Sequence, residues 1–483
     1  MRSNTTVPEY FYYVRGVWKR SANKKKIEVR SPVTGKIMGR VQALLPNEVN
    51  IAIHNAKKAQ VEWAELSMDE RCKYLEKIAD LIDMYADELT ITLVKEIGKP
   101  KKIAEDEVLR TADIFRATAQ HARSLRGELL FGRSMVRSTK EKVSLAYREP
   151  IGVVLCISPF NYPINLSGSK IAPALAMGNG VIFKPSTQGV ISAIMFVKIL
   201  EASGLPKGLV NLVTGRGSEI GDYLVSHEDI DMINFTGSSA VGKSIAKKAG
   251  MKRLLMELGG KDAAIVLNDA DLDKAAKAIV KGAYSYFGER CTAVKRVIVV
   301  NSVADELVSR LKKLVNGLKV GDPIKENVDI GPLISDKAAD YVDELIKDAK
   351  KQGAKFVCSG KREGRIIRPH LIDKVTKKMR IAWEEPFGPV LPVIRARNKD
   401  DAIKIANASE YGLQGSVFTE SVENAIYVAK RLQTGTVVIN DKSSRGPDNF
   451  PFQGIKDSGI GTQGIGYALE AHSRIKSIVM DFK

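Results

Sequence analysis

The sequence predicts a large α/β protein of two or three domains, one of them built on a parallel sheet. The chain has 483 residues, and a single hydrophobic core usually stops growing at about 250–300 residues. Hydrophobic residues make up 44% of the chain and charged residues 27%, as in a folded globular protein. Between residues 152 and 267, short apolar runs alternate with helical segments, which is the pattern of a parallel sheet with helical connections.

The first 130 residues are predicted to be mainly helical, after a short β region. Residues 10–18 and 26–31 are expected to form a strand pair, followed by a turn at 32–35. Apolar side chains then recur at helical spacing from residue 49 to residue 63, and the capping-box sequence at 67–70 begins a second helix.

The later strands and helices follow from apolar runs and their spacing. Strands of the parallel sheet are predicted at residues 152–157, 180–183, 209–213, 232–235 and 263–267. A second α/β round is predicted from a strand at 296–300, a helix at 305–320, and strands near 390–394 and 435–440. Two further strands, at 142–147 and 475–482, are expected from alternating apolar residues and from composition respectively.

Composition excludes several classes of protein. No apolar run reaches the length of about 18 residues that spans a bilayer, and the polar segment 1–10 lacks the apolar core of a signal peptide. The four cysteines have no metal-ligand spacing. The net charge of +19 is mixed with acidic residues on helical patterns, so we interpret it as a solvated surface. We therefore expect a cytoplasmic protein without metal, membrane or nucleic acid.

Three polar residues stand where chemistry could occur. Cys291 lies in the segment FGERCT, where Arg290 can favour the thiolate, although a lone cysteine is more often a core residue. Glu257 ends an apolar strand before two glycines, and could be a general base or part of a surface ion pair. Asn161 follows a buried strand, where its amide can face a ligand crevice or form a turn before Pro163.

Together these segments resemble the aldehyde dehydrogenase superfamily. The blocks ELGGK at 257–261, the Cys291 segment, EEPFGP at 384–389 and Asn440 occur in the family's order, and the resemblance extends from about residue 29 to the C-terminus. It implies that Cys291 is the nucleophile, that Glu257 is the general base, and that Asn161 and the Cys291 backbone N–H bind the oxyanion. The expected reaction passes through a cysteine thiohemiacetal and a thioester.

The resemblance also implies a dinucleotide cofactor. A GxGxxG fingerprint is absent, but relatives place the pyrophosphate at a helix start like that after Ser238. Lys184 resembles the lysine that contacts the adenosine ribose, and Glu385 and Phe387 resemble the pair that positions the nicotinamide half. Thr187 stands where NAD-preferring relatives commonly carry Glu, so the neutral side chain favours NADP, with NAD possible.

Within the superfamily, segments 160–170, 291–296 and 445–452 are most similar to the non-phosphorylating glyceraldehyde-3-phosphate dehydrogenases. By that similarity the substrate phosphate would be bound by Arg110, Tyr162, Arg290 and Arg445. Arg110 by itself would be interpreted as a surface cation. In a second interpretation the arginines are structural, and the substrate is lactaldehyde, glyceraldehyde or another short aldehyde. Glu289 departs from the usual Gln, and its carboxylate would disfavour a nearby thiolate unless it points away.

The resemblance further implies a domain organisation. An NADP-binding domain of Rossmann type is expected at residues 1–130 and 149–259, and an α/β catalytic domain at 260–460. Segments 131–148 and 461–483, both expected to be strand-like, would form an oligomerisation element, because an exposed strand edge is readily completed by another subunit. A homotetramer is expected. An inactive, structural or nucleic-acid-binding family member is the remaining alternative, which the intact Cys291, Glu257 and Asn161 disfavour.

Overall fold

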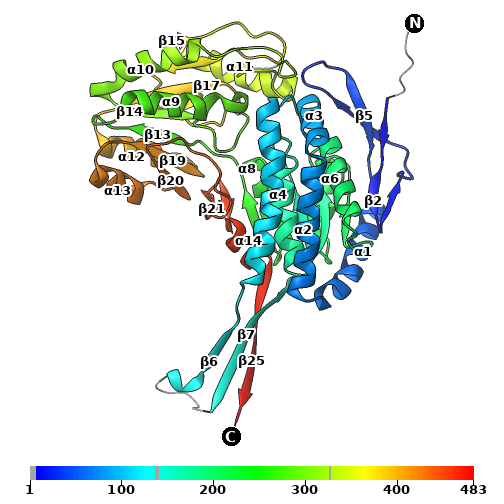
Figure 1. Cartoon of the computed structure of the whole chain (residues 1–483). Helices are drawn as coiled ribbons and strands as arrows, with labels where there is room; N and C mark the ends of the chain where they lie inside the picture. The colour runs from blue at the N-terminus through cyan, green and yellow to red at the C-terminus, as the bar shows by residue number, and fades with distance from the viewer. Residues whose placement is uncertain (1–6, 136–140, 326–327, 483) are drawn as a thin grey trace, which may run out of the picture.

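A computed structural model describes residues 7–135, 141–325 and 328–482 of the chain, so the predicted segments 1–10 and 131–148 lie partly outside the described residues. Two α/β lobes stand side by side, and a long β-arm projects downward from the lower end of one of them (Figure 1). The mixture of parallel sheets and helices confirms the predicted fold class.

The first lobe is built on an eight-stranded sheet of order β23-β12-β11-β8-β9-β10-β2-β3, in which the edge strand β23 is Gly459–Ile460. The predicted run 263–267 does not belong to this sheet, because it forms β13 (Ala263–Val266) of the second lobe. The central strands of the first sheet are parallel, and four of them coincide with predicted apolar runs: β8 (Val153–Ile157), β9 (Gly180–Lys184), β10 (Val210–Leu212) and β11 (Met232–Thr236); the fifth is β12 (Arg253–Glu257). These strands are almost completely buried, as expected where helices cover both faces of a parallel sheet.

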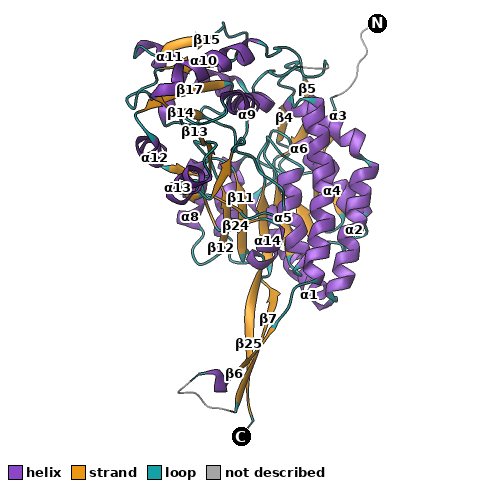
Figure 2. Cartoon of the chain, turned by 60° about the vertical axis from the view of Figure 1, so that its left-hand side comes forward, coloured by secondary structure: helices purple, strands orange, loops and turns teal. Residues whose placement is uncertain are grey.

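Helices cover this sheet on both sides (Figure 2). They are α1 (Pro46–Glu65), α2 (Met68–Met84), α3 (Ala86–Ile97), α4 (Lys101–Arg123), α5 (Asn165–Ala176), α6 (Val190–Ala202), the short α7 (Asp222–Ser226) and α8 (Ser239–Lys248). The predicted capping box is present, because the Ser67 hydroxyl accepts from the Glu70 N–H while the Glu70 carboxylate accepts from Ser67. The predicted helical character of the N-terminal region is thus confirmed.

The predicted N-terminal strand pair is wrong in its pairing. Residues 10–18 contain a hairpin, formed by β2 (Tyr12–Val14) and β3 (Val17–Lys19). The turn residues Arg15 and Gly16 both have positive φ, 56° and 74°, which suits a two-residue hairpin loop. The strand β4 (Lys26–Arg30) pairs instead with β5 (Ile37–Gln42).

The second lobe contains a seven-stranded sheet of order β15-β16-β17-β14-β13-β19-β20. Its strands are β13 (Ala263–Val266), β14 (Arg296–Val300), β15 (Lys355–Cys358), β16 (His370–Asp373), β17 (Val390–Ala396), β19 (Gln414–Phe418) and β20 (Thr436–Ile439). The surrounding helices are α9 (Leu272–Tyr284), α10 (Asn301–Asn316), α11 (Asp336–Lys351), α12 (Lys399–Asn407) and α13 (Val422–Arg431). The helix predicted at 305–320 begins four residues earlier, directly after β14, and ends before Gly317, a residue that disfavours helix.

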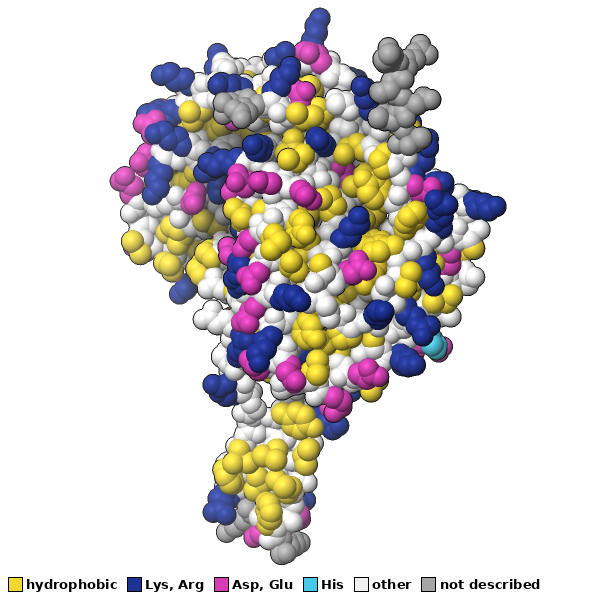
Figure 3. Space-filling model, turned by 45° about the vertical axis from the view of Figure 1, so that its right-hand side comes forward, with side chains coloured by type: hydrophobic (Ala, Val, Ile, Leu, Met, Phe, Trp, Pro, Cys, Tyr) yellow, Lys and Arg dark blue, Asp and Glu magenta, His cyan; other side chains and the backbone are white. Residues whose placement is uncertain are grey.

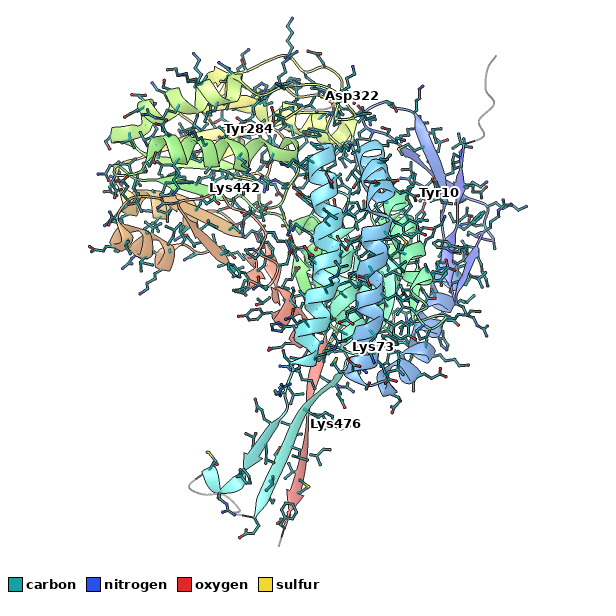
Figure 4. The ribbon with its side chains drawn as sticks, viewed as in Figure 1. Tyr10, Lys73, Tyr284, Asp322, Lys442 and Lys476 are labelled. Carbon is teal, nitrogen blue, oxygen red and sulfur yellow. The ribbon has the colours of Figure 1, made fainter. Side chains whose placement is uncertain are left out.

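The arm is a three-stranded antiparallel sheet of β6 (Glu128–Phe131), β7 (Lys142–Pro150) and β25 (Ser473–Asp481). Lys476 marks the middle of β25 in Figure 4. The expectation that segment 461–483 is strand-like is only partly right, because residues Ile465–Ala471 form the helix α14. Its buried side chains Ile465, Ala468 and Leu469 decide this, since they recur at the spacing of one helical face.

Candidate active site

The three predicted catalytic residues meet where the two lobes join. Glu257 is the last residue of β12, and Asn161 lies in the loop between β8 and α5. Both strands are parallel, so their carboxyl ends lie at the same edge of the sheet, where open α/β sheets bind ligands. Cys291 follows a short turn (Ser285–Gly288) after α9 in the second lobe.

Cys291 and Glu257 are in direct contact. The thiol donates to Glu257 Oε1 over 3.2 Å, and the Glu257 side chain is only 1% exposed. Burial, together with the adjacent Glu257 carboxylate, raises the pKa of the Cys291 thiol, while the Lys295 ammonium and Arg445 guanidinium lower it. Cys291 is therefore a thiol that donates to Glu257, which is the contact that the predicted nucleophile and base require.

Asn161 is fixed beside the nucleophile segment. Its side-chain Nδ2 donates to the backbone carbonyl of Glu289 over 2.8 Å, and the residue is 4% exposed. An amide nitrogen carries two hydrogens, so one anchors Asn161 and the second is available to an oxyanion. The structure thus brings the predicted nucleophile, base and oxyanion donor together.

The backbone before Cys291 is held in an uncommon conformation. Tyr286 and Phe287 have φ values of 50° and 57°, in the left-handed region that bulky residues rarely adopt. Both rings are fully buried and contact each other edge to face. Packing therefore holds this strained turn, and strain maintained by packing is characteristic of functional segments.

A cleft of about 840 Å³ begins at Cys291 and Asn161 and extends along the first lobe. All five predicted cofactor residues line it: Lys184, Thr187, Ser238, Glu385 and Phe387. Its size suits a dinucleotide, and its wall includes the start of α8, whose free N–H groups attract anions.

The structure defines the surroundings of four of these cleft-lining residues. The Lys184 side chain is almost buried, and this burial lowers the pKa of its ammonium to about 8. Ser238 is the N-cap of α8. Glu385 Oε1 accepts from the Gly260 N–H at 3.2 Å and forms an ion pair with Lys295 at 3.0 Å. The Phe387 ring packs edge to face on Phe160, with ring centroids 6.0 Å apart.

Two of the predicted phosphate-binding arginines contact carboxylates. Arg110, on α4, donates from Nη2 to both carboxylate oxygens of Asp448, at 3.0 and 2.9 Å. Arg445 donates from Nη1 to Glu257 and from Nη2 to Gln463 Oε1, the latter over 2.8 Å. Arg110 is thus more than a surface cation, and Arg445 is a direct partner of the general base.

The other two predicted phosphate ligands lie differently. Arg290 donates to the carbonyls of Gly282 at 2.5 Å and Ser285 at 3.3 Å, so it fastens the end of α9 beside Tyr284 (Figure 4). Lys295 and Arg445 are the cations that lower the pKa of the Cys291 thiol, so the expectation that Arg290 favours the thiolate stays a prediction. Tyr162 lies beneath the Lys99 ammonium, 3.6 Å from the ring centroid.

Glu289 points away from the nucleophile. Its Oε1 accepts from the Ile334 N–H over 3.0 Å, and the residue is fully buried. Burial raises the pKa of the Glu289 carboxyl to about 8, so it is protonated at neutral pH. A neutral carboxylic acid has nearly the shape of a Gln side chain and adds no charge beside Cys291.

Sequence reasoning missed three buried lysines around the site. Lys170, on α5, donates to Asn234 Oδ1 at 3.1 Å and Thr236 Oγ1 at 2.6 Å. Lys295 donates to the Cys291 carbonyl, and Lys99 pairs with the buried carboxylate of Glu107. For Lys170 and Lys295 the signal available in the sequence was a lysine beside an apolar run, since an unpaired buried ammonium is costly; Lys99 lies in the polar segment GKPKK and gave no such signal.

Comparison with known proteins agrees with this site. The chain matches the aldehyde dehydrogenase family over residues 18–478 and belongs to that family. It is 54% identical over 473 residues to an NADP-dependent glyceraldehyde-3-phosphate dehydrogenase of Streptococcus equinus, covering 98% of this chain and 99% of the relative.

Two further relatives are informative. The crystal structure of the NADP-dependent glyceraldehyde-3-phosphate dehydrogenase of Bacillus halodurans C-125, complexed with NADP, superposes with a TM-score of 0.97 at 48% identity, covering 98% of this chain and all of that one. A lactaldehyde dehydrogenase of Methanococcus aeolicus is 39% identical over 476 residues, covering 98% of this chain and 100% of the relative.

Proposed function

We propose that this enzyme oxidises glyceraldehyde 3-phosphate to 3-phosphoglycerate with NADP, irreversibly and without inorganic phosphate. The observation that carries the chemistry is the contact between Cys291 and Glu257 at the end of a dinucleotide-sized cleft. The substrate and cofactor are supported by full-length relatives of that name at 54% and 47% identity. The arginines Arg110 and Arg445 provide cations on the substrate side.

Acylation begins with transfer of the thiol proton along the existing contact to Glu257. The Cys291 thiolate then adds to the aldehyde carbon and forms a thiohemiacetal oxyanion. The free amide hydrogen of Asn161 and the Cys291 backbone N–H stabilise this charge, and such preorganised donors typically contribute about 3–4 kcal/mol each. Collapse of the oxyanion expels a hydride and leaves a thioester on Cys291.

The cleft fits NADP by its own chemistry. The Ser158 hydroxyl is buried on its wall with no hydrogen-bond partner among the described residues, and Lys184 is a buried cation beside the neutral Thr187. When bound, the nicotinamide supplies the hydride acceptor. Lys184, Thr187 and Ser238 would hold the adenosine and phosphate half, and Glu385 and Phe387 the nicotinamide half.

Deacylation requires Glu257 a second time. After the proton taken from Cys291 has passed to solvent, the Glu257 carboxylate removes a proton from water, the resulting hydroxide attacks the thioester carbon, and the thiolate leaves; the acid product then loses its proton and becomes the carboxylate. Arg445 donates to Glu257 in the free enzyme. This hydrogen bond must open before a water molecule can donate to the carboxylate. Thioester hydrolysis makes the oxidation practically irreversible.

The test is NADPH formation across a panel of aldehydes, with and without inorganic phosphate. We expect the highest kcat/KM with glyceraldehyde 3-phosphate, a large preference for NADP over NAD, and no requirement for phosphate. The lactaldehyde dehydrogenase relative favours a second candidate, a short unphosphorylated aldehyde. Equal or higher kcat/KM with lactaldehyde or glyceraldehyde would establish that candidate and contradict the first.

We also propose that the enzyme works as a cytoplasmic homotetramer assembled through the arm. Apolar side chains lie exposed on the arm (Figure 3), including Leu129, Leu130, Phe131, Ile475 and Val479. An exposed apolar strand edge is a site for pairing with another chain. Light scattering should give four times the mass of one chain, and a monomeric mass would refute the assembly.

A further inference from the structure

The proposed phosphate site already holds an internal anion. Asp448 lies in the loop that follows β20, three residues after Arg445. Its carboxylate receives three hydrogen bonds from Arg110, at 2.9 to 3.3 Å, and Oδ1 lies 4.0 Å from Arg445 Nε. Asp448 therefore occupies the space between the two guanidinium groups that a substrate phosphate would need.

The charges at this point are balanced before any substrate arrives. Arg110 is paired with Asp448, and Arg445 is paired with Glu257 and approaches Asp448. Two guanidinium charges thus face two carboxylates. A phosphate dianion gains little from such a neutral cluster unless at least one carboxylate gives up its arginine.

Asp448 is the carboxylate best placed to leave. Its side chain is 19% exposed and that of Arg110 is 37% exposed, whereas the Glu257 side chain is 1% exposed. The Asp448 backbone is held independently, because its carbonyl accepts from the Ile465 N–H over 3.0 Å. Rotation of the side chain alone would release Arg110 while the loop stays docked.

Resting on the function proposed above, we propose that Asp448 is a specificity-determining residue, an internal counter-ion that an anionic aldehyde displaces from Arg110 and Arg445. A dianion offers both arginines a stronger acceptor than one carboxylate does. A neutral aldehyde has no anionic group that could accept from these arginines, so the Asp448 contacts stay in place. Selectivity therefore arises from exchange of one anion for another.

This exchange also bears on the general base. An anion that draws Arg445 toward the vacated Asp448 position weakens the hold of Arg445 on Glu257. Glu257 is then freer to accept protons from Cys291 and later from water. Binding of the substrate's anionic end is thereby coupled to release of the base at its reactive end.

The test is Asp448→Asn, which keeps the side-chain shape and removes the competing charge. With NADP saturating, the KM for glyceraldehyde 3-phosphate should fall by about threefold to tenfold, the range expected for one partly exposed charge contact. The inhibition constant of inorganic phosphate against the aldehyde should fall by the same factor. The KM for glyceraldehyde should stay unchanged.

Asp441→Asn is the matched control, because Asp441 is an exposed carboxylate of the same loop whose carboxylate accepts from the Lys442 N–H. It should leave all three constants unchanged. Thermal unfolding checks that both variants fold, and Asp448→Ser provides a second removal of the charge if Asp448→Asn does not fold. An unchanged or raised KM for glyceraldehyde 3-phosphate in the Asp448 variants would overturn the proposal and make Asp448 a fixed support for Arg110. A wild-type enzyme with no preference for the phosphorylated aldehyde would instead refute the proposed function.

Discussion

Replacing Glu289 by Gln should stabilise the protein, and increasingly so as the pH rises. Glu289 is fully buried, its Oε2 has no partner among the described residues, and burial raises the pKa of its carboxyl from 4.5 to about 8. A group with a raised folded-state pKa contributes stability that is present below the unfolded pKa and is lost as the pH rises to the folded value. The affected window is therefore about pH 4.5–8.

The size of the effect follows from the same shift. At about 1.4 kcal/mol per pKa unit, the cost of Glu289 is roughly 1 kcal/mol at pH 5 and about 3–4 kcal/mol at pH 8. The Gln side chain does not titrate, and its amide oxygen still accepts from the Ile334 N–H. For a domain of ordinary size, each kcal/mol moves Tm by about 2–4 °C, so the Tm difference between variant and wild type should widen by several degrees.

The assay is differential scanning fluorimetry of both proteins at pH 5, 6.5 and 8, at one protein concentration. Glu96→Gln is a matched control, because this buried carboxylate accepts from the Ile191 N–H, the Ser192 N–H and the Ser192 hydroxyl at 2.6 to 2.8 Å. There the new amide group would face donors, so the variant should be less stable at every pH. A Tm difference for Glu289→Gln that does not change with pH would refute the argument, since it would mean that Glu289 has the same charge in the folded and unfolded states.

Four further predictions concern the chemistry. Cys291→Ser should abolish aldehyde oxidation while NADP binding, measured by fluorescence titration, stays intact; measurable turnover would exclude the covalent route. Glu257→Gln should lose the stopped-flow burst of NADPH together with steady-state turnover, because Glu257 accepts the Cys291 proton before acylation; a burst of about one equivalent per site followed by slow turnover would show that Glu257 acts only on the thioester. Arg110→Ala should lower kcat/KM for glyceraldehyde 3-phosphate by about tenfold or more relative to glyceraldehyde, because only the former loses a charge-assisted contact. Arg445→Ala should slow both substrates, because the Arg445 guanidinium lowers the pKa of the Cys291 thiol, and should slow glyceraldehyde 3-phosphate more, because only that substrate loses a phosphate contact; equal losses for both substrates would contradict the phosphate contact.

The sequence allowed the alternation of strands and helices to be predicted because each apolar run in a parallel sheet is buried on both faces and is therefore continuous. Four of the predicted runs coincide with β8, β9, β10 and β11 of the first sheet, and the fifth coincides with β13 of the second sheet. The N-terminal pairing could not be predicted in the same way, because strand partners depend on contacts between segments distant in the chain. The hairpin at Arg15 and Gly16 is local, but the partner of β10 is Tyr13 in β2.

Motifs identified Cys291, Glu257 and Asn161 as site candidates, and they predicted their chemical roles through family resemblance. Residue types and their order in the sequence were therefore sufficient to predict these three residues and their roles. Only the tertiary structure decided which groups face one another: Arg445 contacts the general base, Arg290 binds carbonyls at the end of α9, and Arg110 pairs with Asp448, which lies 338 residues further along the chain. Charge partners, burial and pKa shifts arise from contacts between separate elements, so no local pattern in the sequence contains them.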